Sequence, residues 1–131
     1  MATTAGAALC GQALFGEWSE RWGRQAADLV LRRHPDVDAI SCGSDQIARG
    51  VCDRLRELNR AVPTDIAVTG YDDWPVMALA ARPPLTSVDL RLEDLGRHAA
   101  NLLLDAIAGT PHHGVLELPA QLVTRESTLG S

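Results

Sequence analysis

Two adjacent carboxylates, Asp72 and Asp73, follow a short apolar run that ends at Gly70. The run, residues 66–68, comes after a turn at Pro63 and is predicted to be a buried strand. In a sheet of parallel strands, ligands bind just beyond the carboxyl ends of the strands. Carboxylates at that position can accept hydrogen bonds from a polyol or a sugar. The alternative is that both acids belong to the next turn and face water, and chemistry alone favours this alternative.

A second polar pair, Ser44 and Asp45, follows another predicted strand, residues 38–42. Right-handed βαβ units bring successive strand ends to one edge of a sheet, so this pair is expected close to Asp72. Both residue types also cap helices, and a helix is predicted to begin here. One residue can cap the helix while its neighbour faces a ligand, so both interpretations remain open.

Trp18 and Trp22 are notable in a chain that has few aromatic residues. Their i, i+4 spacing is that of two core residues on one helical face. Trp18, however, stands where the helix begins, and its ring could stack on the apolar face of a sugar. We therefore keep Trp18 as a candidate ligand contact and assign Trp22 to the core.

The elements that must position these side chains alternate along the chain. Residues 1–16 show no clear periodicity and are predicted to be an irregular lead-in. Apolar spacing predicts helices over residues 18–34, 46–58 and 92–108 and a short helical turn over 75–80. Strands are predicted at residues 38–42, 66–69, 85–89, 115–118 and 122–125. Strands alternating with long helices indicate an α/β fold with a parallel sheet.

Composition narrows the function classes. A chain of 131 residues suits one domain, and its net charge of −5 argues against a standing nucleic-acid surface. Three cysteines without CxxC spacing suit a reducing cytoplasm, and no apolar run approaches the length that spans a membrane. No hydrolase, P-loop, zinc-protease or dinucleotide motif is present. The sequence therefore predicts no catalytic residues, no metal ligands and no cofactor.

Several segments together resemble the lactose/galactose repressor (LacI/GalR) family. Residues 62–73 are similar to its "VPxDIxVxGxDD" stretch, and residues 82–89 to its "PPLTTV" strand. Gly96 with residues 99–109 resembles its "LGxxAxxxLLxxIxG" helix, and residues 118–128 its terminal "LPxxLVxRxST". Residues 44–50 fit "NDxxAxG" with serine in place of the usual asparagine. The order and spacing of these motifs make the set specific.

The resemblance implies a periplasmic-binding-protein-like (type I) fold, in which a small effector, usually a sugar or nucleoside-like compound, binds in a cleft between two subdomains. Residues 17–131 would be the C-terminal portion of that effector-binding domain. The matched positions imply ligand contacts at five residues: Trp18, Ser44, Asp45, Asp72 and Leu92. The serine at position 44 has a shorter polar reach than asparagine, so its contact is expected to be with a closer hydroxyl or through water.

The resemblance also implies partners. Operator DNA would be bound only through an N-terminal helix-turn-helix that lies upstream of this chain, and no membrane is involved. Family dimer contacts resemble residues 46–58 and 76–81, so a homodimer is expected. In the family, the helix at 92–108 belongs to the other subdomain. Without that subdomain, we expect the helix to fold back on its own sheet, swap with a second copy or pack in a dimer.

Two other function classes remain as alternatives. The first is a periplasmic or extracellular sugar-binding component of a transport system on the same fold. The lack of a recognisable signal peptide, the odd cysteine count and the "LVxRxST" ending count against it. The second is a sugar-processing enzyme, which the absence of a nucleophile–base or metal set disfavours.

Overall fold

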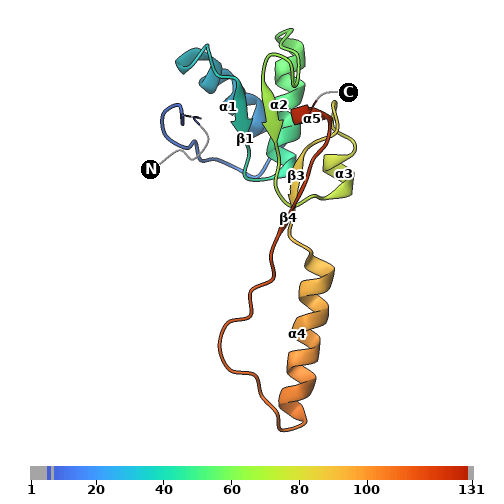
Figure 1. Cartoon of the computed structure of the whole chain (residues 1–131). Coiled ribbons are helices and arrows are strands. Elements are labelled where there is room, and N and C mark those ends of the chain that lie inside the picture. The colour runs from blue at the N-terminus through green and yellow to red at the C-terminus, as the bar shows by residue number, and fades with distance from the viewer. Residues whose placement is uncertain (1–5, 7, 130–131) are drawn as a thin grey trace.

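The computed structural model describes residues 6 and 8–129 and has the expected α/β content (Figure 1). Strand β1 (Ala39–Ser41) pairs in parallel with β2 (Ala67–Thr69), and β3 (Ser87–Asp89) pairs antiparallel with β4 (Gln121–Val123). Parallel bridges join residues 69 and 86 and residues 72 and 89, so the chain after β2 runs beside β3. The predicted parallel arrangement is therefore confirmed, with β4 as an antiparallel edge.

The long helices lie close to their predicted positions. They are α1 (Glu20–Arg33), α2 (Asp45–Glu57) and α4 (Leu92–Ile107), with short α3 (Pro75–Ala78) and α5 (Glu126–Leu129). Helix α1 begins two residues later than its apolar spacing suggests because the Ser19 hydroxyl accepts the Trp22 N–H at 3.0 Å. Before α1, the described residues contain neither helix nor strand.

The core lies between the parallel strands and the helices α1 and α2. Its fully buried apolar side chains come mainly from α2, β2 and the approach to β3, and the largest are Val51, Leu55, Ile66, Val68 and Leu85. Helix α2 packs against β2 on one side and against α1 on the other, and it buries its apolar stripe in this core.

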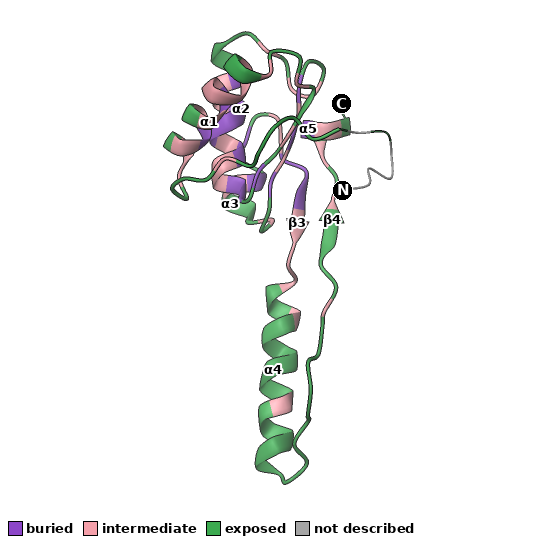
Figure 2. Cartoon of the chain, turned by 90° about the vertical axis from the view of Figure 1, so that its left-hand side faces the viewer, coloured by how far each residue is buried: buried purple, intermediate pink, exposed green. Residues whose placement is uncertain are grey.

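Helix α4 and the chain that returns from it form an arm that extends away from this core (Figures 1 and 2). No described residue of α4 is buried. The expectation that α4 folds back on its own sheet is therefore wrong for the single chain. The other two expected arrangements, a swap or a dimer, involve a second copy.

The strand predicted at residues 115–118 is absent, and the chain there is extended without ladder partners. The chain between α4 and β4 runs along the arm, where α4 is the neighbouring element (Figure 2), and its apolar residues Val115 and Leu116 are exposed. A strand needs another strand to satisfy its backbone groups, and a helix offers none. The prediction was wrong for that reason. Among the described residues, no helix is both long and apolar enough to cross a membrane.

Candidate functional site

The carboxyl ends of the three parallel segments come together at one edge of the sheet. Backbone bonds fix their order: the Asp45 N–H donates to the Tyr71 carbonyl at 2.8 Å, and the Asp72 N–H donates to the Val88 carbonyl at 3.0 Å. The chain after β1, the chain after β2 and the end of β3 therefore lie side by side. Topology predicts ligand binding at this edge.

Trp18 lies at this edge with 67% of its surface exposed. Its six-membered ring faces Gly43, the residue after β1: a Cβ atom built on Gly43 would lie 3.6 Å from Trp18 Cη2. An exposed tryptophan beside a strand end presents a flat apolar surface to whatever occupies the edge. Trp22, by contrast, is half-buried, as expected of a helix face that packs inward.

Asp72 is exposed and adopts a left-handed backbone conformation with φ of 103°. Partial burial, followed by the nearby charge of Asp45, raises the pKa of Asp72 above the usual aspartate range. Within the described part of the chain, its carboxylate has no hydrogen-bond partner. Asp72 is therefore a free acceptor at the edge where ligands are expected.

Ser44 and Asp45 lie at the same edge but are buried. The Ser44 hydroxyl accepts the Ile47 N–H at 3.2 Å and so caps α2. One oxygen of the Asp45 carboxylate accepts the Trp74 N–H at 2.7 Å, and the other accepts the Ser87 hydroxyl at 2.5 Å. Both side chains thus already have protein partners. Burial raises the pKa of Asp45, and the bond from Ser87 opposes this rise.

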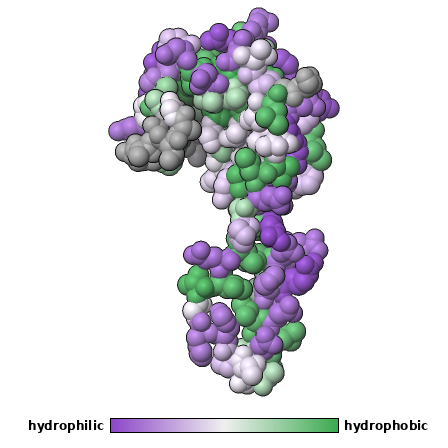
Figure 3. Space-filling model, viewed as in Figure 1, coloured by the Kyte–Doolittle hydropathy of each residue, from purple (hydrophilic) through white to green (hydrophobic). Residues whose placement is uncertain are grey.

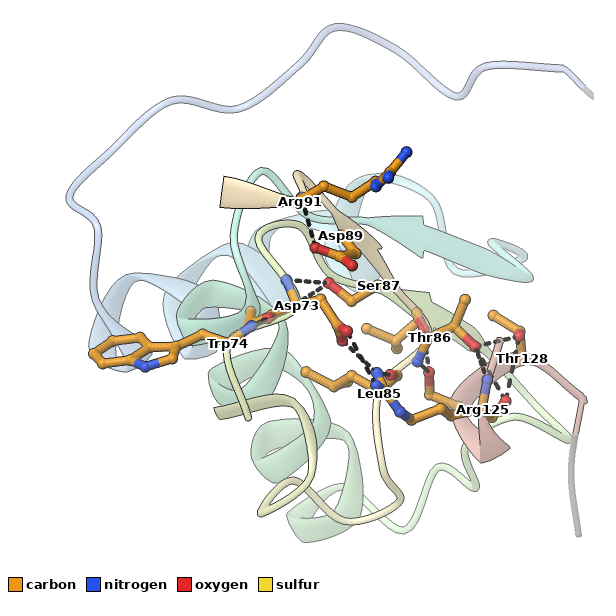
Figure 4. Close-up of polar contacts among 12 residues, drawn as sticks. Asp73, Trp74, Leu85, Thr86, Ser87, Asp89, Arg91, Arg125 and Thr128 are labelled. Carbon is orange, nitrogen blue, oxygen red and sulfur yellow. Dashed lines mark hydrogen bonds and ion pairs between the residues drawn. The ribbon is translucent and has the colours of Figure 1, made fainter. Parts of the chain in front are cut away.

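Leu92 stands apart from these four residues. It is the first residue of α4, is 62% exposed, and follows Asp89 at the end of β3 along the chain. Asp89 accepts the Arg91 backbone N–H at 2.7 Å (Figure 4). The Arg91 side chain pairs with Asp94. The structure therefore places Leu92 at the base of the arm, next to the edge but outside its hydrogen-bond network.

The sequence offers a turn as one interpretation of Asp73 and does not predict its partner. The Arg125 guanidinium holds the Asp73 carboxylate with two bonds, at 2.6 and 3.2 Å, and also donates to the Leu85 carbonyl at 2.7 Å (Figure 4). The two partners are far apart in the sequence, so local spacing could not predict the pair. The available signal was a charged residue in an otherwise mostly apolar stretch before α5.

A separate hollow of about 490 Å³ lies at the opposite end of β2. Its charged lining is Arg56, Arg60 and Arg82, and it contains none of the predicted ligand contacts. These arginines already pair with Asp53 or with backbone carbonyls. The described residues also include no group of three or more His, Cys, Asp or Glu side chains that could hold a metal ion.

Comparisons with known proteins match this arrangement. The model of the periplasmic binding protein-like domain matches residues 5–128. The HTH-type transcriptional regulator CelR of Thermobifida fusca is 42% identical over 86% of this chain. A solved CelR–cellobiose complex superposes with a TM-score of 0.74, over 86% of this chain and 34% of that one.

A LacI family regulator from Arthrobacter sp. FB24, solved in complex with lactose, is 36% identical with a TM-score of 0.76, over 84% of this chain and 42% of that one. The chain spans about a third of the length of the curated relatives, 33% in the case of CelR. The chain belongs to the periplasmic binding protein-like domain family, in the form found in the effector-binding domains of LacI-type transcriptional regulators.

Proposed function

We propose that this chain is a sugar-binding part of a LacI/GalR-type transcriptional regulator and forms one wall of the effector cleft. The observation that carries the proposal is that the Asp72 carboxylate, which has no hydrogen-bond partner among the described residues, and the exposed ring of Trp18 both lie at the carboxyl edge of the parallel strands. Relatives with 36–42% identity were solved with cellobiose and with lactose, which favours a disaccharide or a related sugar as the effector.

Each side chain suits a different part of a sugar. The Asp72 carboxylate can accept hydrogen bonds from two ring hydroxyls, and charge-assisted bonds of this kind are stronger than neutral ones. The Trp18 ring can stack on the apolar C–H face of the same sugar. Leu92 would add apolar contact from the base of the arm, and the Ser44 hydroxyl remains a candidate for a weaker contact.

The remaining partners follow from the same proposal. Operator DNA would be bound by a helix-turn-helix in another part of the protein, since this chain carries a net charge of −5. The regulator would act in the cytoplasm as a homodimer through α2 and residues 76–81, where Val76 and Leu79 are exposed. Binding without catalysis is expected, because among the described residues this edge presents Asp72 as a free acid and no nucleophile–base pair.

A transport-type sugar-binding protein is the second candidate. It would use the same edge and the same two contacts, so sugar binding alone does not separate the two functions. The regulatory relatives favour the first. A helix-turn-helix encoded upstream in the same reading frame would support the regulator, and a secretion signal there would support the transport protein.

The experiment is a titration of the chain with cellobiose and with lactose, followed by NMR at the Trp18 indole and the Asp72 amide. A single wall of a cleft should bind in the millimolar range, because it makes only part of the contacts that a complete cleft makes. Asp72→Ala should weaken the affinity roughly tenfold or more, by loss of charge-assisted bonds. Asp36→Ala is the matched control: Asp36 is an exposed aspartate before β1, at the opposite edge.

Two results would count against the proposal. An unchanged dissociation constant in Asp72→Ala would remove Asp72 from the site. The absence of any shift at Trp18 with either sugar would argue against a sugar of this kind.

A further inference from the structure

We propose that Asp45 and Arg125 are positioning residues that hold the turn carrying Asp72 in its binding conformation without touching the ligand. The inference rests on the proposed function, because it takes Asp72 as a ligand contact. It gives three neighbouring acids different roles. Asp72 binds the ligand, while Asp45 and Asp73 hold the backbone of the turn that carries Asp72.

The turn adopts a conformation that these residues do not prefer. Asp72 and Asp73 are consecutive non-glycine residues with positive φ, 103° and 51°. Isolated residues of this kind are uncommon, and they persist where surrounding contacts over-determine the backbone. The contacts that hold this turn must therefore come from outside it.

Asp45 supplies the first of these contacts. It is 1% exposed, and one of its oxygens accepts the N–H of Trp74, the residue that follows the turn. Gly70, just before the turn, leaves room for this carboxylate, because a Cβ atom at position 70 would overlap Asp45 Oδ1. Asp45 thus fastens the end of the turn to the start of α2.

Arg125 supplies the second contact from the other end of the chain. Its guanidinium grips the Asp73 carboxylate in a two-bond fork. Arg125 is itself held in place. Its backbone N–H donates to the Thr86 hydroxyl at 2.7 Å, and its guanidinium donates to the Leu85 carbonyl. A planar fork of this kind sets orientation as well as distance.

The Ser87 hydroxyl links the two contacts. It accepts the Asp73 N–H at 3.1 Å and donates to the Asp45 carboxylate (Figure 4). Backbone and side chain of Asp73 are therefore both engaged, as is the N–H of Trp74. The Asp72 carboxylate is the acid of the three that stays free for a ligand.

The test is hydrogen exchange of the Asp73 and Trp74 amides, measured by NMR in the full chain. Asp45→Ala and Arg125→Ala should each accelerate exchange at these two amides roughly tenfold or more, since local opening becomes easier. Exchange in the core of α2, at Val51 and Leu55, should change much less. Asp45→Asn and Arg125→Lys, which keep part of the bonding, should restore slow exchange in part.

Asp65→Ala is the matched control. The Asp65 carboxylate also accepts a backbone N–H, that of Ala61 at 2.8 Å, but at the opposite end of β2. This variant should accelerate exchange at Ala61 and leave Trp74 unchanged. If an alanine variant fails to fold, the asparagine and lysine variants decide, because they should show a smaller change at the same two amides.

Cellobiose affinity gives a second readout, which a purely structural role would not move. Folded Asp45 and Arg125 variants should bind the sugar roughly tenfold or more weakly although Trp18 and Asp72 are intact. Unchanged exchange at Asp73 and Trp74, or unchanged affinity alongside faster exchange, would overturn the positioning role. If the wild-type chain binds no sugar, the proposed function fails, and the exchange data alone decide whether the residues hold the turn.

Discussion

At the residue scale, three aspartates of one small region have different surroundings and therefore different capacities. Asp45 is buried with both oxygens engaged, Asp73 is held by Arg125, and Asp72 is exposed. Burial raises the pKa of Asp45 and of Asp72. Burying a charge costs free energy unless the charge is paired, whereas an exposed carboxylate is hydrated and remains available to a ligand. The residue type alone therefore does not identify the ligand contact.

The three cysteines give a direct test of the core. Cys42 and Cys52 are buried, and burial raises the pKa of each thiol to about 12. Cys10 is exposed. The thiolate is the reactive form, so iodoacetamide at neutral pH should modify Cys10 alone in the folded chain.

Mass spectrometry checks this result by counting the added groups. The native chain should gain one adduct, on the peptide that contains Cys10, and the chain unfolded in guanidinium should gain three. Modification of Cys42 or Cys52 at a rate close to that of Cys10 would mean that the core between α2 and the strands is open in solution.

Sequence spacing predicted which residues lie at the carboxyl edge of the sheet but not the hydrogen bonds and ion pairs among them. Placing Ser44, Asp45 and Asp72 together needed only the rule that parallel strand ends share an edge. The Asp73–Arg125 pair joins segments that are distant in sequence, and no periodicity signals such a contact. Likewise, the sequence left open whether Asp45 faces a ligand or the protein, because that depends on the Ser87 hydroxyl and the turn at Trp74.

At the element scale, α1 and α2 cross with their backbones in close contact. The crossing is made by two glycines that face each other's helix. A Cβ atom on Gly23 would overlap the Ile47 carbonyl of α2, and one on Gly50 would overlap the Glu20 carbonyl of α1. Side chains at either position would push the helices apart, and α2 carries much of the core.

Gly50→Ala should therefore lower the free energy of unfolding by about 1–3 kcal/mol, the usual effect of overpacking. Alanine is the better helix former, so this loss would occur against helix propensity. Gly96→Ala is the matched control, because Gly96 lies inside α4 with open space where its Cβ atom would be. That variant should be neutral or slightly stabilising.

Urea unfolding followed by circular dichroism measures both variants. The comparison isolates the crossing, since both substitutions add one methyl group to a helix interior. Equal midpoints for Gly50→Ala and the wild type would show that the helices separate at no cost, and the packing of α1 on α2 would then need revision.

Periodicity predicted the long helices well and the strands less well. Each long helix carries enough apolar positions to define its face, and serines mark the starts of α1 and α2. The strands have three residues each, so their pairing decides whether they exist at all. Residues 121–123 pair with β3 and form β4. Residues 115–118 have a similar share of apolar residues, but the element beside them is the helix α4.

At the scale of the whole molecule, the arm and the rest of the described chain, which we call the body, differ in how they are stabilised. The body has a buried core, but α4 leaves its apolar face in water, as Figures 2 and 3 show. The exposed large side chains on α4 are Leu92, Leu95, Leu103, Leu104 and Ile107. Isolated helices of this length are marginal in water. Charge pairs on the polar face, such as Arg97 with Glu93, add little.

The apolar face of α4 therefore needs a partner. Burying one leucine contributes roughly 1.5–3 kcal/mol, so several together favour association strongly. From the resemblance to the LacI/GalR family, we propose that this partner is the other subdomain of the effector-binding domain. In the present chain, the face is available to a second copy, and we expect association that depends on concentration.

Leu103→Asp should weaken this association, because it places a charge at the centre of the apolar face, at a residue that is 63% exposed in the single chain. Asn101→Asp is the matched control: it adds the same charge to the same helix, but on the opposite face, at 100° per residue. Sedimentation velocity over a range of concentrations measures the difference. A dimer formed through α2 and residues 76–81 would survive both substitutions. Association that is lost in Leu103→Asp and kept in Asn101→Asp is therefore assigned to α4. Equal behaviour of the two variants would show that α4 does not associate with a second copy.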